Sequence, residues 1–165
     1  REATESLAGE DSAGYGIDGC SAPNFAMSLH GLGRAMAFYA TAQERSDVRS
    51  KAAARLTDAM RMHPELVAGE GRTCTELMRA TDGRVAIKTG AEGVFIAIVP
   101  EKKIGIALKI ADGGTRASEC VMASLLARVG VLDPHHPAAR ARIHAPIHNR
   151  RGIHAASVRP GAALA

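Results

Sequence analysis

The chain contains no tryptophan and few aromatic side chains of any kind. Aromatic residues make up 3% of its 165 residues, whereas hydrophobic residues make up 46%. The chain is therefore long enough for one domain with a sizeable core and too short for two ordinary domains, and aliphatic and alanine side chains must fill that core. No stretch approaches the roughly 18 consecutive apolar residues that a transmembrane helix needs, so we expect no membrane partner.

Cysteine is scarce, and its spacing forms no pair motif. Cys20, Cys74 and Cys120 are odd in number and include no CxxC sequence. This pattern favours a reducing compartment, the cytoplasm, over a disulfide framework. We expect Cys120 on the buried stripe of a helix and leave the role of Cys74 open. Cys20 lies in a glycine-bracketed turn, where packing alone does not account for it.

Acidic residues are missing from one end of the chain. Residues 1–133 carry 16 Lys and Arg against 17 Asp and Glu, whereas residues 134–165 carry five Arg and no acid. The tail also repeats proline and has little hydrophobic periodicity, so we predict a basic, weakly structured C-terminal extension over 134–165. Because the tail lacks interleaved aromatic residues for base stacking, we expect no nucleic-acid partner.

Helices are predicted in the first half of the chain. Residues 29–43 carry apolar side chains at helical spacing after Ser28, a suitable N-cap. A second helix over 47–62 is expected to stop before Pro64. Residues 1–13 are small and acidic, so we expect a surface loop or a frayed end there.

A third, short helix and a sheet are predicted next. Thr73-Cys-Thr-Glu76 fits a capping box that opens a helix ending near Met78. Val85 and Ile87 then alternate with Lys88, so the lysine leaves a strand on the face opposite two aliphatic side chains. The remaining elements are strands over 94–99 and 104–111 and a helix over 115–129. This order predicts an α/β (α+β) fold, with helices followed by a three-stranded antiparallel sheet packed on a C-terminal helix.

Four blocks of the sequence occur in this chain order: Tyr15–Asn24, Gly71–Met78, Lys88–Gly93 and Ala111–Gly114. Together they resemble the bacterial asparaginase II family, the Rhizobium-type asparaginases. That family is similar in fold to the serine β-lactamases and penicillin-binding proteins, in which a Lys-Thr-Gly strand lines the active site. The resemblance runs from about residue 14 to residue 132 and continues weakly through residues 149–153.

The resemblance implies hydrolysis of L-asparagine to aspartate and ammonia. It makes Lys88 and Thr89 the catalytic residues of this chain, and Gly90 the residue that lets the substrate approach the strand. Asp18 is expected to bind the α-amino group of asparagine, and Arg72 its α-carboxylate. Without a catalytic role, a strand-end lysine such as Lys88 would simply be solvated at a sheet edge.

Two of these assignments depend on groups elsewhere. Cys20 matches a zinc ligand of the family, whose co-ligands lie upstream of this chain, and one thiolate cannot complete a tetrahedral site. Arg72 has an alternative role in a surface ion pair with Glu70 or Glu76. The family also suggests a homodimer.

The serine that this chemistry requires does not occur in the expected motif. A helical Ser-x-x-Lys sequence brings an amine to a hydroxyl over one turn, and no serine here has a lysine three residues later. We therefore expect residues 1–133 to be the C-terminal part of a β-lactamase-like asparaginase domain, cut from a longer chain and inactive alone. Two alternatives remain: a peptidase-like or β-lactamase-like hydrolase with another acyl substrate, and a truncated fragment without catalysis.

Overall fold

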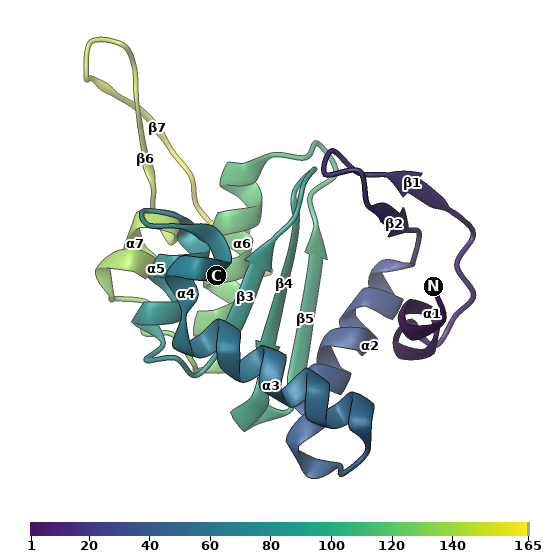
Figure 1. Ribbon diagram of the computed structural model, residues 1–165. Coiled ribbons are helices and arrows are strands. Elements are labelled where there is room, and N and C mark those ends of the chain that lie inside the picture. The colour runs from purple at the N-terminus through teal and green to yellow at the C-terminus, as the bar shows by residue number, and fades with distance from the viewer. Residues whose placement is uncertain (165) are drawn as a thin grey trace.

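A three-stranded antiparallel sheet organises the chain, and the computed structural model describes its residues 1–164. The strands are β3 (Ala86–Thr89), β4 (Val94–Val99) and β5 (Ile104–Lys109), in the spatial order β3-β4-β5 (Figure 1). Both pairings are antiparallel, with Lys88 opposite Ile96 and Phe95 opposite Leu108. The mixed α/β class and the three-stranded antiparallel sheet are confirmed.

One face of this sheet carries the main core. Strand alternation sends Ile87, Phe95, Ala97, Val99 and Leu108 to this face, where all five are buried. Three helices supply the side chains that pack against them: α5 (Thr73–Ala80), α6 (Thr115–Val129) and α7 (Pro137–Ile143). As the composition requires, Phe95 is the only aromatic member of this cluster within residues 1–164, and the rest of it is aliphatic, alanine, methionine and cysteine.

The opposite face of the sheet is covered by α2 (Leu29–Ala40) and α3 (Val48–Met62) (Figure 1). The α2 helix lies against β5 at Gly105, where an added Cβ would overlap the backbone of Met36 and Ala37. A smaller core forms between α2, α3 and the sheet around Ala40, Ala86 and Ile98. Lys88 lies on this face, opposite the buried Ile87, as the alternation predicts.

The helix boundaries of the first half are largely as expected. Ser28 caps α2, because its side chain accepts a hydrogen bond from the Gly31 N–H at 2.9 Å. Asp47 caps α3 in the same way, and α3 ends at Met62. A short 3-10 helix, Ala42–Glu44, follows α2, and α4 (Pro64–Ala68) follows α3. No helix within residues 1–164 is long and apolar enough to cross a membrane.

The predicted capping box at the start of α5 is wrong. Arg72 is the N-cap residue, and it makes no side-chain capping bond. Thr73 already belongs to the helix, and its hydroxyl accepts a 3.2 Å hydrogen bond from Arg142 Nε on α7. The Thr73 side chain is therefore used to hold α7 rather than to cap α5.

The N-terminal segment is more ordered than the sequence indicates. Residues 1–13 contain the helix α1 (Glu2–Ala8), with Ala8 buried and Ser12 only 8% exposed. Glu10 accepts hydrogen bonds from the Ser28 backbone and hydroxyl, which joins this segment to α2. The prediction of a surface loop fails because small residues such as Ala8 pack closely on a helix without a long apolar pattern.

The tail divides into a packed helix and a projecting hairpin. In α7, Ala139 and Ile143 are buried in the main core, and Arg142 pairs with Glu76 of α5. The strands β6 (Pro146–His148) and β7 (His154–Ser157) then form a hairpin that extends from the body (Figure 1). The prediction of a weakly structured extension from residue 134 is therefore incorrect for α7, which is part of the core.

Candidate functional site

The Lys-Thr-Gly sequence lies at the end of the edge strand β3. Lys88 is exposed, and its Nζ donates a 2.7 Å hydrogen bond to the Thr89 carbonyl oxygen. The Gly90 N–H donates to the Val94 carbonyl oxygen at 2.8 Å, which turns the chain back into β4. A Cβ at Gly90 would lie 3.3 Å from Val94 Cβ, so a larger residue would press on this turn. The arrangement holds one amine at an open strand end.

Cys74 anchors this strand end to α5. Its Sγ accepts a 3.3 Å hydrogen bond from the Thr89 N–H, and its side chain is 1% exposed. Burial raises the pKa of the Cys74 thiol, whereas the Thr89 N–H and the charges of Lys88 and Arg72 act in the opposite direction. The thiol therefore stays protonated near neutral pH, and its role is structural support for Thr89. Sequence reasoning left Cys74 open, and its place in the first turn of a short helix was the only signal.

Two of the glycine-containing sequence blocks meet at one end of the sheet. Gly93 and Gly113 both have positive φ, +71° and +73°, and a Cβ on Gly93 would lie 3.1 Å from the carbonyl carbon of Gly113. The Ile110 N–H also donates to the Gly93 carbonyl oxygen at 3.1 Å. Glycine suits both positions because of their positive φ, and at Gly93 a side chain would also press on the backbone of Gly113. The turn after β3 is thereby fixed to the loop that enters α6.

Arg72 stands apart from the ion pairs expected for it. Glu70 pairs with Arg79 at 2.7 Å, and Glu76 pairs with Arg142 at 2.5 Å. Within residues 1–164 no salt bridge involves Arg72, whose guanidinium is exposed beside the start of α5. The alternative role of Arg72 in a pair with Glu70 or Glu76 is therefore wrong. Its charge acts on Cys74, together with that of Lys88.

Asp18 and Cys20 lie together in another part of the chain. They belong to the exposed turn between β1 (Tyr15–Ile17) and β2 (Pro23–Phe25), where Cys20 Sγ lies 3.8 Å from Asp18 Oδ2. Among the residues that the structure describes, no hydrogen bond or salt bridge joins this turn to Lys88 or Arg72. The structure thus brings Lys88, Thr89, Gly90 and Cys74 together through contacts that do not include the turn of Asp18.

The turn at Cys20 does not by itself make a zinc site. Cys20 and Asp18 supply two side chains of suitable type, and residues 1–164 contain no group of three or more His, Cys, Asp or Glu that could hold a metal ion. A tetrahedral zinc ion needs four donors. The residues present therefore do not fit the ion alone, and we derive no chemical step through it.

These observations define a mixed α/β protein that presents a lysine at the open end of an antiparallel sheet, supported by a buried cysteine. Residues 1–160 match the family model described as L-asparaginase II. The chain belongs to this family, which is a family of amidohydrolases. No curated protein matches the chain.

Proposed function

We propose that this chain contributes to an L-asparaginase, which hydrolyses L-asparagine to L-aspartate and ammonia. The observation that carries the proposal is the exposed Lys88 amine at the end of β3, in a chain that belongs to the L-asparaginase II family. The fold that we propose for the complete domain is that of the serine β-lactamases. In that arrangement the strand of Lys88 forms one wall of the active site.

Lys88 takes part in proton transfer in this proposal, as one amine of two Ser-Lys pairs. The serine of a Ser-x-x-Lys pair attacks the side-chain amide carbonyl carbon of asparagine and gives its proton to the lysine of that pair, while Lys88 holds a second serine and tunes the proton transfer to the leaving ammonia. Water then attacks the resulting ester and releases aspartate. Because no serine in the sequence precedes a lysine by three residues, the nucleophile comes from a segment outside these 165 residues. The chain then holds the C-terminal part of the site and is inactive alone.

The remaining site residues bind substrate in this proposal. Thr89 and the backbone at Gly90 orient the amide along the strand edge, and the free guanidinium of Arg72 suits the α-carboxylate of asparagine. Asp18, in the exposed turn between β1 and β2, binds the α-amino group. The proposal also includes a zinc ion at Cys20, held with ligands from outside the chain, and a homodimer. It places the protein in the cytoplasm, which the free thiols of all three cysteines support.

Ammonia release from L-asparagine tests the proposed function. It is measured on this chain and on the full product of the gene that encodes it, with L-glutamine and a β-lactam as comparison substrates. We expect asparagine hydrolysis only by the full gene product. Activity of the 165-residue chain alone would contradict the external serine and direct attention to Thr89 or a cysteine. A full product that hydrolyses only the β-lactam, or nothing, would refute the asparaginase assignment.

A further inference from the structure

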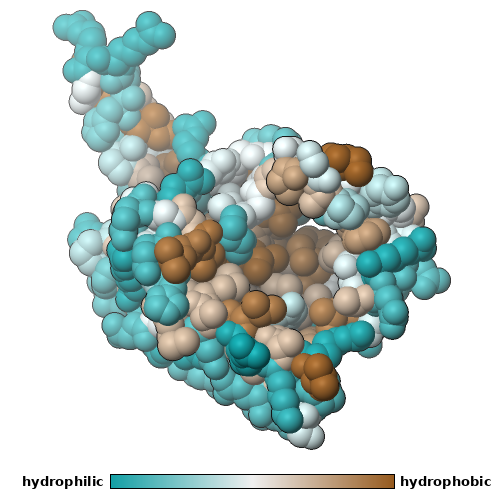
Figure 2. All heavy atoms as spheres, in the orientation of Figure 1, coloured by the Kyte–Doolittle hydropathy of each residue, from teal (hydrophilic) through white to brown (hydrophobic). Residues whose placement is uncertain are grey.

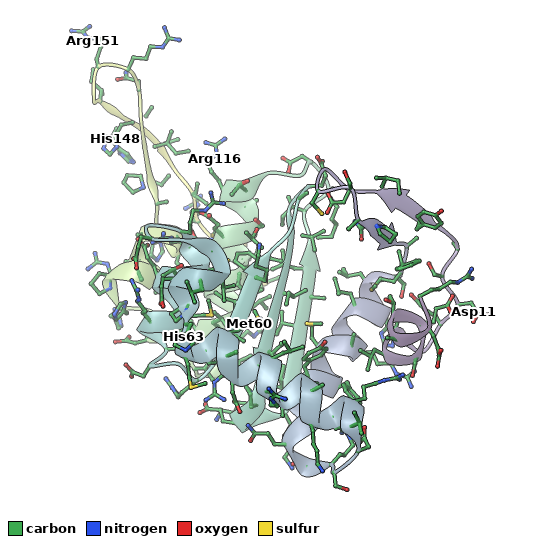
Figure 3. All side chains as sticks on the ribbon, viewed as in Figure 1. Asp11, Met60, His63, Arg116, His148 and Arg151 are labelled. Carbon is green, nitrogen blue, oxygen red and sulfur yellow. The ribbon has the colours of Figure 1, made fainter. Side chains whose placement is uncertain are left out.

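Two histidines lie opposite each other on the hairpin of β6 and β7. Figure 2 shows this hairpin projecting from the body, with mainly hydrophilic side chains on its surface. His148 on β6 is paired in register with His154 on β7, and their ring centroids lie 5.9 Å apart. Figure 3 shows His148 on the stem of the hairpin, away from the tip that carries Arg151. Both histidines are exposed, so solutes can reach the two imidazoles.

The turn between the two strands holds the pair in this register. The Asn149 N–H donates a 2.9 Å hydrogen bond to the Ile153 carbonyl oxygen. Asn149 Oδ1 accepts hydrogen bonds from the N–H groups of Arg151 and Ile153, at 2.9 and 3.0 Å. The ladder is irregular between Ile147 and His148, and such irregularities change the direction of a side chain. The backbone therefore sets the separation of the two rings.

The hydrogen bonds of the two rings leave a nitrogen free on each. His154 Nε2 lies 2.9 Å from Ser157 Oγ, so Nδ1 is the nitrogen of His154 that can bind an ion. Metal-binding histidines usually make such a hydrogen bond through their second nitrogen, which fixes the orientation of the ring. Within residues 1–164 no hydrogen bond or ion pair involves the ring of His148, whose neighbour is the His154 ring.

The spacing and the type of donor suit a divalent transition-metal ion. A metal–nitrogen distance of about 2.1 Å places the centroids of two imidazoles roughly 5–6 Å apart across one ion. The observed separation is 5.9 Å, with the ring planes tilted by 58°. Imidazole suits zinc, nickel and copper ions, whereas magnesium and calcium prefer oxygen ligands. Residues 134–165 contain no Asp or Glu, so the hairpin itself offers no carboxylate to those two ions.

We propose that His148 and His154 chelate a divalent ion of the zinc, nickel or copper class, with water in the remaining coordination positions. Two imidazoles do not enclose the ion, and residues 1–164 contain no group of three or more ligand side chains. The site is therefore one for an exchangeable ion and not a closed structural zinc site. Both donors bind as neutral imidazoles, so the protein need not release a thiol proton.

This site is separate from the proposed asparaginase chemistry. The hairpin carries none of the residues assigned to the active site, and Figure 1 shows it apart from the β1–β2 turn that contains Cys20. The nearest charges along the hairpin are those of Arg150 and Arg151 in the turn. Their positive sign opposes a dication, and salt screens this repulsion. Binding should therefore strengthen as the ionic strength rises.

Zinc titration of the chain, followed by NMR of the histidine ring nitrogens, tests the site. All proteins carry Cys20→Ser, which removes the exposed thiol as a competing ligand. We expect the ring signals of His148 and His154 to shift together and to saturate, with the largest change at Nδ1 of His154. Magnesium at the same concentrations should shift neither ring.

Three variants decide whether the pair is the site. His148→Gln and His154→Gln should each weaken zinc binding at least tenfold, because loss of a mere second-shell partner already costs about 10–100-fold. His135→Gln removes another exposed histidine, outside the hairpin, and should bind zinc as the parent does. The proposal is overturned if zinc shifts only one of the two rings, if no shift saturates, or if His135→Gln weakens binding as much as His148→Gln. Equal shifts with magnesium would indicate unspecific cation attraction and overturn it as well.

Discussion

The close contact between α2 and β5 gives a prediction that the structure makes quantitative. A Cβ at Gly105 would overlap the backbone of Met36 and Ala37 and lie 2.7 Å from the Gly33 carbonyl oxygen. Overpacking a core costs about 1–3 kcal/mol, and we expect Gly105→Ala near 3 kcal/mol because helix backbone, not a side-chain end, must move. For a chain of this size that corresponds to a fall of about 10 °C in Tm.

Gly33 provides the matched control on the facing helix. A Cβ there would lie 3.8 Å from Ala107 Cβ, which is an ordinary contact. Gly33→Ala should therefore stabilise the protein by about 0.5–1 kcal/mol, because alanine has the higher helix propensity. Urea unfolding followed by far-ultraviolet circular dichroism measures both changes. If Gly105→Ala is as stable as Gly33→Ala, α2 does not lie on β5 as described.

Three further predictions concern the tail, the cysteines and the N-terminal segment. Ile143→Ala, in the buried part of α7, should lower the free energy of unfolding by about 3 kcal/mol. Ile153 is 55% exposed, so Ile153→Ala should change that free energy by less than about 0.5 kcal/mol. Equal losses in the two variants would contradict the packing of α7. At pH 8 a thiol reagent should label exposed Cys20 quickly, and Cys74 and Cys120 only on unfolding, because burial raises the pKa of both thiols and keeps them neutral; mass spectrometry of the labelled peptides decides this. The Ser28 N–H and hydroxyl lower the pKa of Glu10, so its carboxylate stabilises the fold above about pH 4.5 and loses that effect as the pH falls through the folded-state pKa. Glu10→Gln should therefore make the free energy of unfolding depend less on pH in the acid range. An unchanged pH dependence would count against the contact between Glu10 and Ser28.

The sequence predicts the central sheet and its flanking helices because their patterns are local. Alternation places Lys88 opposite Ile87, and the limits of β4 and α6 match the predicted runs 94–99 and 115–129. Helix α1 and the packed α7 have short, alanine-containing sequences whose stability comes from distant partners such as Arg142 with Glu76. No periodicity within either segment reports those contacts.

The candidate site could be predicted only in part for a similar reason. Lys88, Thr89 and Gly90 are adjacent in sequence, so a three-residue motif places them together. The support from Cys74 joins residues 15 positions apart, and only the folded chain reveals it. Glu70 likewise pairs with Arg79, and Glu76 pairs with Arg142, although Arg72 is nearer to both in sequence. The direction of the side chains in the folded chain, and not the separation in sequence, decides which arginine is the partner.

The central claim is that the Lys88 amine takes part in asparagine hydrolysis. Its most direct test compares kcat/KM for L-asparagine between Lys88→Met and Lys109→Met in the full gene product. Both lysines are exposed, lie on strands and donate to the next carbonyl oxygen, at 2.7 Å and 2.5 Å. We predict a loss of about 10²–10⁴-fold for Lys88→Met, the usual contribution of a proton-transfer group, and little change for Lys109→Met. Retention of activity by Lys88→Met within about threefold of the control would contradict the account, since general acid–base catalysis contributes far more than that.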